Sequence, residues 1–214
     1  MDYQQKKGAF KQFKTFVRLN LEKIGLYPVR KDFLKVLPKN GVGAELGVFQ
    51  GKFSVDLLNE TKPTKLHLID PWWKASGDLY GEWSRYHNNG QLLETRKAYQ
   101  QAQDAVATAE NSDVAEFHVA DDVAVLKSMK SQSLDWAYVD STHLYEHTVA
   151  ELEQLQRLIK PEGIIAGHDW YPDPTNRHHG VYKAVMEFCE KYNWEIFRLD
   201  KKFTQWAIRR KPVN

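Results

Sequence analysis

The chain has 214 residues, with 30 Lys and Arg against 28 Asp and Glu, so its formal net charge of +2 gives no electrostatic reason to expect a nucleic-acid partner. Hydrophobic residues make up 42% and charged residues 27%, which is the balance of a folded globular protein. It contains no apolar run of the roughly 20 residues that a membrane helix needs and no apolar signal core at the N-terminus, so we expect a cytoplasmic protein without a membrane partner.

The first 38 residues predict a helical segment. Apolar residues recur at helical spacing over 9–25, and a second short helix is expected over 30–37, ending before Pro38. We interpret 1–214 as one domain in which 1–38 form an N-terminal helical segment. This amphipathic segment could cover the sheet or serve a dimer, so a homo-oligomer stays open.

From residue 42 onward, strand and helix patterns alternate. We predict strands over 42–46, 65–69, 114–119, 133–139, 164–167, 194–199 and 203–209, helices over 53–60, 92–108, 123–129, 145–159 and 180–192, and a loop over 71–90. The alternation predicts a Rossmann-like, doubly wound, mostly parallel seven-stranded sheet with helices on both faces and a C-terminal antiparallel hairpin. In such sheets ligands bind at the carboxyl ends of the strands.

The end of the first strand carries a glycine-rich turn. A dinucleotide fingerprint fails because its third glycine position holds Leu46, and a phosphate-binding P-loop fails because Phe53 follows Gly51-Lys52. What remains is an acidic residue followed by glycines four apart, Glu45-x-Gly47-x-x-x-Gly51. Glycines let the backbone turn sharply and approach a ligand closely.

This turn resembles the nucleotide loop of S-adenosylmethionine-dependent methyltransferases. The resemblance implies that Glu45 faces the ammonium group of the cofactor and that Ser54, at a helix start, binds its carboxylate. Asp70, which closes the second strand, would accept hydrogen bonds from the ribose hydroxyls. Asp121 lies where members of that family contact adenine, although it could equally cap the next helix.

Further polar residues follow the fourth and fifth strands. Asp140 ends one, and His168-Asp169 end the other, so three potential ligands for a divalent cation converge if the strands are neighbours. Alternatively, Asp140 and Asp169 cap helices or orient His143.

These strand ends resemble those of metal-dependent O-methyltransferases, the catechol type and more closely the macrocin and antibiotic-tailoring type. The tailoring group has Asp-x-x-His followed by Tyr-Glu, matched here by Asp140, His143, Tyr145 and Glu146. The resemblance covers about residues 41–188 and implies that an acidic or amide pair helps Asp140 to hold Mg²⁺ and that His143 is the general base. Here His168 replaces the usual acidic residue, which favours softer ions such as Mn²⁺, Fe²⁺, Zn²⁺ or Ni²⁺.

The sequence thus predicts a methyltransferase that uses S-adenosylmethionine and a divalent metal to methylate a hydroxyl of a small metabolite, with His143 and Asp140 as its catalytic residues. The unperturbed pKa of a histidine, about 6.5, suits proton removal near neutral pH. A metal-independent methyltransferase and a non-catalytic cofactor-binding protein are the alternatives. Sugar hydroxyls, phenols and other small polar metabolites all remain possible acceptors.

Several other side chains are open to two interpretations. The aromatic residues Trp72, Trp73, Trp83 and Tyr86 are candidate walls of the acceptor pocket or core residues. A solvent-exposed position is the expectation for His147, and a half-buried structural thiol for Cys189. The loop residues Arg177, His178 and His179 could line the acceptor site or supply a ligand.

Overall fold

The structure is a computed structural model that describes residues 30–72, 85–88 and 91–212. The chain divides into two compact units, Met1–Phe33 and Leu34–Asn214. The helix predicted over 9–25 lies outside the described residues, and the short helix predicted over 30–37 is a 3-10 helix, η1 (Arg30–Val36). None of the described helices has the length and apolar character needed to cross a membrane.

The second unit is built on a seven-stranded sheet with the order β5-β2-β1-β6-β7-β9-β8. Its strands are β1 (Val42–Leu46), β2 (Lys65–Asp70), β5 (Ala115–Val119), β6 (Leu134–Val139), β7 (Ile159–Gly167), β8 (Trp194–Asp200) and β9 (Gln205–Arg210). The first five in this list run parallel, whereas β9 pairs antiparallel with both β7 and β8. The predicted fold class is confirmed, including the C-terminal hairpin.

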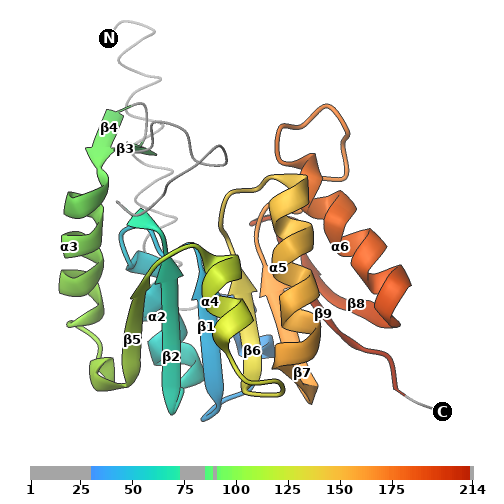
Figure 1. Cartoon of the computed structure of the whole chain (residues 1–214), viewed down its shortest axis with the longest axis horizontal. Helices are drawn as coiled ribbons and strands as arrows, with labels where there is room; N and C mark the ends of the chain where they lie inside the picture. Colours follow the sequence, from blue (N-terminus) through green and yellow to red (C-terminus); the bar gives the residue numbers. More distant parts are fainter. Residues whose placement is uncertain (1–29, 73–84, 89–90, 213–214) are drawn as a thin grey trace, which may run out of the picture. The chain divides into compact units, whose positions relative to one another are not determined.

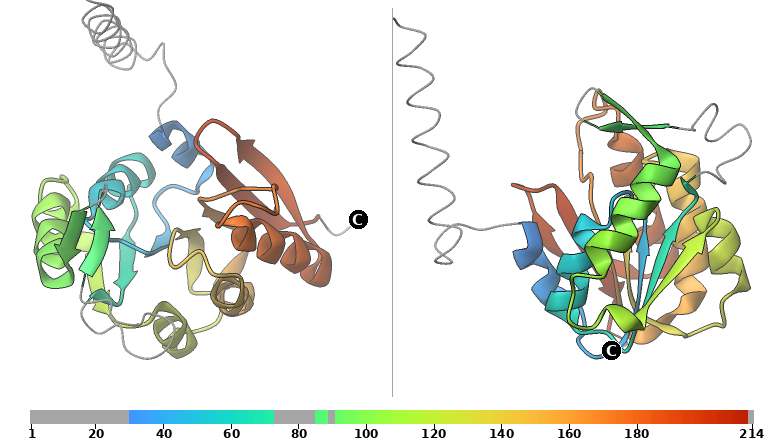
Figure 2. Two further views of the ribbon diagram at one scale, coloured as in Figure 1. Left: turned by 90° about the horizontal axis from the view of Figure 1, so that it is seen from above. Right: turned by 90° about the vertical axis from the view of Figure 1, so that its left-hand side faces the viewer.

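Five α-helices flank this sheet. They are α2 (Lys52–Thr61), α3 (Thr95–Val106), α4 (Asp122–Ser128), α5 (Tyr145–Leu158) and α6 (His179–Tyr192). Seen from above, α4, α5 and α6 cover one face, and α2 and α3 lie on the opposite side (Figure 2). A 3-10 turn, η3 (Ser112–Val114), leads into the edge strand β5.

Apolar side chains of the central strands form the core beneath α5 and α6. Leu152 and Leu155 of α5 are fully buried in one cluster with Ala137 and Val139 of β6. The apolar positions of α5 recur every three or four residues, so the helix presents one continuous stripe to the sheet. This packing fixes α5, and with it the turn that precedes the helix.

Two segments differ from the prediction. The region expected to be a loop up to residue 90 contains β3 (Arg85–Asn88), which pairs antiparallel with β4 (Gln91–Glu94) in a separate hairpin. The helix expected from residue 92 therefore begins at Thr95. Each of these strands has four residues, and their pairing is a contact between segments that periodicity in one segment does not reveal.

The strand β7 is also longer than predicted, because it begins at Ile159 and includes residues 160–163, which the prediction left between a helix and a strand. A register shift between Leu134 and Trp136 of β6 accommodates this start. The carboxyl ends of β6 and β7 still lie side by side, with Val139 opposite Gly167. The polar residues that follow both strands are thereby brought to one edge of the sheet.

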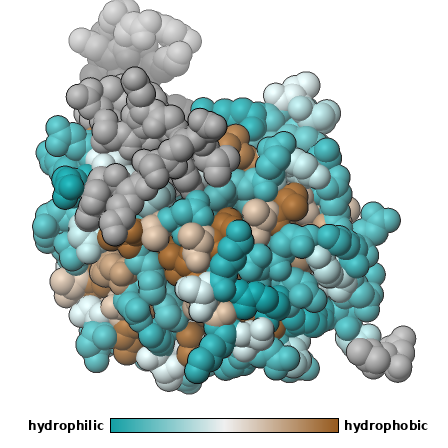
Figure 3. Space-filling view, viewed as in Figure 1, coloured by the Kyte–Doolittle hydropathy of each residue, from teal (hydrophilic) through white to brown (hydrophobic). Residues whose placement is uncertain are grey.

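The face that carries α4 and α5 is mostly hydrophilic, with its hydrophobic side chains in small patches (Figure 3). On this face β5 and β2 lie beside α4, and none of the described helices lies in front of them (Figure 1). The edge strand β5 is partly exposed, whereas β2 is buried from Leu66 to Asp70.

Candidate functional site

The glycine-rich turn after β1 is shaped by close backbone contacts. Gly47 has φ 86°, and a Cβ built there would lie 2.1 Å from the carbonyl oxygen of Asp140. Gly51 has φ 72°, and its Cβ would lie 2.8 Å from the Cα of Ala102 in α3. Both positions therefore require glycine for two reasons, the left-handed backbone and the absence of room. The turn after β1 therefore packs directly against the end of β6, where Asp140 lies.

Glu45 and Ser54 form a buried pair beneath this turn. Glu45 is 1% exposed, and the Ser54 hydroxyl donates to its Oε2 at 2.5 Å. In the structure the Ser54 hydroxyl thus donates to Glu45, whereas the sequence predicted that it binds the carboxylate of a cofactor. A buried carboxylate needs such donors, since burying a charge without hydrogen bonds is costly. The expected contacts of both residues with a cofactor stay predictions.

Asp70, at the end of β2, holds the turn in place. Its Oδ2 accepts the backbone N–H groups of Val48 and Phe49 at 3.0 and 2.9 Å, and its Oδ1 accepts that of Trp72 at 2.9 Å. The first two bonds tie the loop after β1 to the end of β2. Whether or not Asp70 also binds ribose, it orders the loop in which Gly47 lies.

Asp121 caps the helix that follows β5. Its side chain accepts the backbone N–H of Ala124 at 2.9 Å, which is the N-cap interaction that the sequence left as one of two options. A contact with adenine stays a prediction.

The expectation that His147 is exposed is wrong. His147 is 3% exposed, and its Nε2 lies 2.6 Å from Oδ1 of the buried Asp122. One turn later in α5, the fully buried Glu151 accepts a hydrogen bond from the hydroxyl of Ser141. Helical spacing alone places His147 and Glu151 on one face but does not reveal that α4 packs against that face. The group links α4, α5 and the residue directly after Asp140.

The strand ends of β6 and β7 bring together the other predicted residues. Asp140, His168 and Asp169 each offer one ligand atom, and these atoms all lie within 4.8 Å of one another. Nδ1 of His168 is 3.0 Å from Oδ2 of Asp169 and 3.7 Å from Oδ1 of Asp140. The tight turns here leave two residues in the left-handed region, His143 with φ 63° and Asp169 with φ 61°.

His143 lies between two carboxylates. Its Nε2 is 2.9 Å from Oδ2 of Asp169 and 3.4 Å from Oδ1 of Asp140. Burial opposes the charged imidazole, but hydrogen bonds to Asp140 and Asp169 outweigh it and raise the pKa of His143 to about 9. Burial likewise opposes the charge of Asp169, yet hydrogen bonds from His143 and His168 hold its pKa far below the usual range. At neutral pH the His143 imidazole is therefore protonated, whereas its unperturbed pKa predicted a neutral base.

Comparison with known families assigns this chain to a family. The profile of a family described as "Methyltransferase domain" matches residues 44–170, which include both the glycine-rich turn and the cluster after β6 and β7. This chain belongs to that methyltransferase family. S-adenosylmethionine is the expected cofactor of the family. A search of curated proteins found no match.

Solved structures share the fold of this methyltransferase at low sequence identity. A protein from Corynebacterium glutamicum is 13% identical with a TM-score of 0.61, over 96% of this chain and 99% of that one. Cofactor-bound Rv0187 from MTB is 14% identical with a TM-score of 0.60, over 84% and 78% of the two chains. A ribosomal protein L11 methylase from Lactobacillus delbrueckii subsp. bulgaricus is 11% identical with a TM-score of 0.56, over 85% and 77%.

The cluster after β6 and β7 also contains a residue that the sequence left undecided. Nδ1 of His178 lies 2.8 Å from Oδ1 of Asp169, and its ring stacks on His143 with centroids 4.5 Å apart and planes 7° apart. The neighbouring His179 instead contacts the carbonyl oxygen of Tyr171, and Arg177 is exposed. The consecutive histidines in the sequence drew attention to this loop. Only the folded position of the loop shows that His178, and not His179, contacts Asp169.

Of the aromatic residues considered for the acceptor wall, Trp72 belongs to the core. It is fully buried, packs its ring against Tyr99 at 4.9 Å and donates from Nε1 to the carbonyl oxygen of Phe49. Trp73 and Trp83 lie outside the described residues, as does the side chain of Tyr86. Cys189 is a free thiol and is buried, not half-buried as predicted.

Proposed function

We propose that this methyltransferase moves the methyl group of S-adenosylmethionine to a hydroxyl of a small metabolite with the help of a divalent metal. The observation that carries the proposal is the convergence of four side chains after β6 and β7, namely Asp140, His143, His168 and Asp169. They lie next to the glycine-rich turn, since Gly47 abuts the backbone of Asp140. Cofactor and acceptor would thus meet at the edge where both motifs end.

The residues proposed to hold the cofactor are those of the first two strand ends and the α4 cap. The glycine turn follows β1, and Glu45 and Asp70 would supply the acidic groups for the ammonium and ribose of S-adenosylmethionine. Because Asp70 also fixes the loop, its loss would affect cofactor binding both directly and through the loop.

The donor set fits a divalent cation of the first transition row. Two carboxylates and one imidazole, from Asp140, Asp169 and His168, suit Mn²⁺, Fe²⁺, Zn²⁺ or Ni²⁺ better than a site made of oxygen alone. When bound, such an ion lowers the pKa of a substrate hydroxyl and fixes its orientation.

His143 is proposed to take up the proton that the acceptor hydroxyl loses. Its contacts with Asp140 and Asp169 stabilise the imidazolium that results, which is the form that these carboxylates favour. The same contacts mean that His143 must first lose its proton, so carboxylates engaged by a cation would leave it a better base. Holding the hydroxyl in line with the cofactor's methyl group supplies much of the remaining rate.

A metal-independent reaction is the second candidate. The contact between His143 and Asp169 is present without any ion and resembles the pairing that orients a catalytic histidine. In that case the whole of the acid–base chemistry rests on His143.

Calorimetric titration of S-adenosylhomocysteine into the protein tests these proposals, first with chelator and then with Mn²⁺ or Mg²⁺ and candidate polyols and phenols. Cofactor binding in every condition, with acceptor heat only when metal is present, supports the metal-assisted reaction. If the cofactor binds and the heat of acceptor binding is the same with and without metal, the metal-independent reaction is favoured. No cofactor binding would overturn both.

His143→Gln separates catalysis from binding. We expect this variant to bind S-adenosylhomocysteine with unchanged affinity and to lose methyl transfer by about 100-fold or more, as expected for loss of a general base. A variant that binds cofactor and transfers methyl groups at the normal rate would remove His143 from the mechanism. The protein would be a non-catalytic cofactor binder if no acceptor were turned over with any metal.

A further inference from the structure

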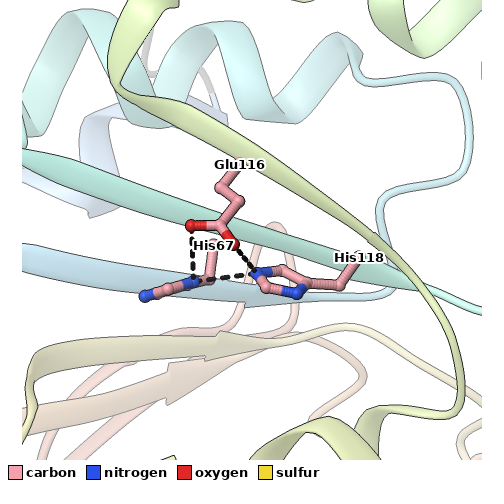
Figure 4. Close-up of side chains that lie close together, drawn as sticks. All are labelled: His67, Glu116 and His118. Atoms are coloured by element: carbon pink, nitrogen blue, oxygen red, sulfur yellow. Dashed lines mark hydrogen bonds and ion pairs between the residues drawn. The ribbon is translucent and has the colours of Figure 1, made fainter.

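A second group of potential metal ligands lies on the sheet, apart from the strand ends. His67 of β2 and Glu116 and His118 of β5 each offer one ligand atom, and these atoms all lie within 4.8 Å of one another. Figure 4 shows the three side chains turned toward a common point between the two strands. None of them belongs to the glycine-rich turn or to the Asp140 cluster.

The register of the sheet explains why they meet. His67 is directly opposite Glu116, and His118 is opposite Ile69, two residues further along β2. Side chains two residues apart in a strand point to the same face, so all three share one face of the sheet. None of the helices that the structure describes lies in front of β2 and β5 on this face (Figure 1). The side chain of Glu116 is 47% exposed and that of His118 is 22% exposed, so an ion from solution can reach these two ligands.

The distances are close to those around a bound metal ion. Nδ1 of His67 lies 2.9 Å from Nε2 of His118, and that nitrogen lies 3.6 Å from Oε1 of Glu116. Tetrahedral Zn²⁺, with bonds of about 2.0–2.1 Å, separates its ligand atoms by about 3.4 Å. Small side-chain rotations would make the separations equal.

The chemistry of the three groups matches as well. Two imidazole nitrogens and one carboxylate form a ligand set used for zinc in proteins, with a fourth position left for water. The side chains of His67 and His118 are 11% and 22% exposed, so their contact is partly buried.

Lys65 is compatible with an ion at this position. It pairs with Oε2 of Glu116, whereas Oε1 is the oxygen nearer to His118. Glu116 could thus bind the ion through one oxygen and keep its pair with Lys65 through the other. Such a second contact orients a metal-binding carboxylate.

We propose that His67, Glu116 and His118 bind one zinc-like divalent ion, which clips the edge strand β5 to β2 away from the site of methyl transfer. The ion would act on stability, because a ligand that binds only the folded state shifts unfolding by mass action. Its effect would reach the strands that lead to Asp70 and Asp121. The proposal does not depend on the proposed reaction.

The test titrates Zn²⁺ alone into untagged, chelator-treated protein by calorimetry. The starting variant is His168→Ala/Asp169→Asn, which disrupts both candidate groups that contain Asp169 and leaves the three ligands intact. The buried group of Asp121, Asp122 and His147 also stays intact, and the substitutions added below do not touch it. We expect one equivalent of Zn²⁺ to bind. We also expect Tm to rise by roughly 5–10 °C at a Zn²⁺ concentration about 100 times the Kd.

Adding His118→Ala to that variant should weaken Zn²⁺ binding by at least about tenfold, the lower end of what even outer-shell partners contribute. Glu116→Gln, which keeps the size of the side chain, should do the same, and Tm measured with chelator checks that both variants fold. Co²⁺ in place of Zn²⁺ gives a visible spectrum that reports tetrahedral coordination by these ligands. No binding to the starting variant, or binding that both added substitutions leave unchanged, would overturn the proposal.

Discussion

Nε2 of His147 and Oδ1 of Asp122 lie 2.6 Å apart, and both side chains are buried between α4 and α5. Burial opposes the charge of Asp122, but the hydrogen bonds from His147 and Glu151 and the charge of His147 together outweigh it and lower the pKa of Asp122. Burial also opposes the charge of His147, yet its hydrogen bond to Asp122 raises its pKa, while burial and the nearby Asp122 raise the pKa of Glu151 well above its usual value. These shifts favour the charged forms of Asp122 and His147 and the neutral form of Glu151.

Removing His147 should destabilise the fold. His147→Ala leaves the Asp122 carboxylate buried without its partner, and we expect a loss of about 3–5 kcal/mol in the free energy of unfolding, measured in urea. The control is Glu153→Gln, which breaks the exposed pair with Lys191 and should cost less than about 1 kcal/mol. Equal losses in the two variants would contradict the role assigned to the buried pair.

A methyl group at Gly47 should disturb both stability and cofactor binding. Gly47→Ala places a Cβ against the carbonyl oxygen of Asp140 in a left-handed backbone. Its matched control is Asn40→Ala, at an exposed residue with φ 58°, where about 1–2 kcal/mol is expected from the backbone alone. We expect Gly47→Ala to cost about 1–3 kcal/mol more than the control in thermal unfolding, as overpacking does. Gly47→Ala should also lose S-adenosylhomocysteine binding. If Gly47→Ala and Asn40→Ala destabilise the protein equally, the steric contact at Gly47 is contradicted.

The protonation of His143 predicts a pH dependence of stability in metal-free protein. Its pKa is about 9 in the folded chain and about 6.5 when unfolded, so the folded state holds the extra proton between these values. The stabilisation of the folded state by protonated His143 is complete below about pH 6.5 and is lost as the pH rises through about 9. Unfolding in chelator at several pH values should therefore show this fall in wild type and not in His143→Gln. The same substitution at His179, which contacts the Tyr171 carbonyl, should keep the fall.

The identity of residue 168 should select the metal. His168→Asp turns the proposed donor set into three carboxylates, and we expect affinity for Mg²⁺ relative to Mn²⁺ to rise on the order of tenfold, by calorimetry. His179→Asp adds the same charge at the start of α6 and should leave the ratio unchanged. A ratio that moves equally in both variants would show a general charge effect and remove His168 from the site.

Cys189 should react slowly in the folded protein. Burial raises the pKa of its thiol to about 11, so only about one thousandth is thiolate at pH 8. Alkylation followed by mass spectrometry should therefore be far slower in buffer than in urea. Equal rates would show that this part of α6 opens readily.

The sequence by itself determined the sheet, most of its strands and the methyltransferase class. The strand predicted over 42–46 coincides with β1, because a buried parallel strand is an apolar run that ends where polar residues begin. Asp70 and Asp140 marked such ends, and the shared direction of parallel strands is enough to bring their side chains to one edge. Glycine spacing identified the turn because its conformation excludes other residues.

Only the tertiary structure decided which of the remaining polar residues act together. The contacts of His147 with α4, of His178 with Asp169, and of His67 with β5 join segments whose own patterns are unremarkable. The same holds for the β3–β4 hairpin and for the insertion of β9 between β7 and β8. Periodicity reports which face of one element is buried, whereas these features depend on which element covers that face and in what register.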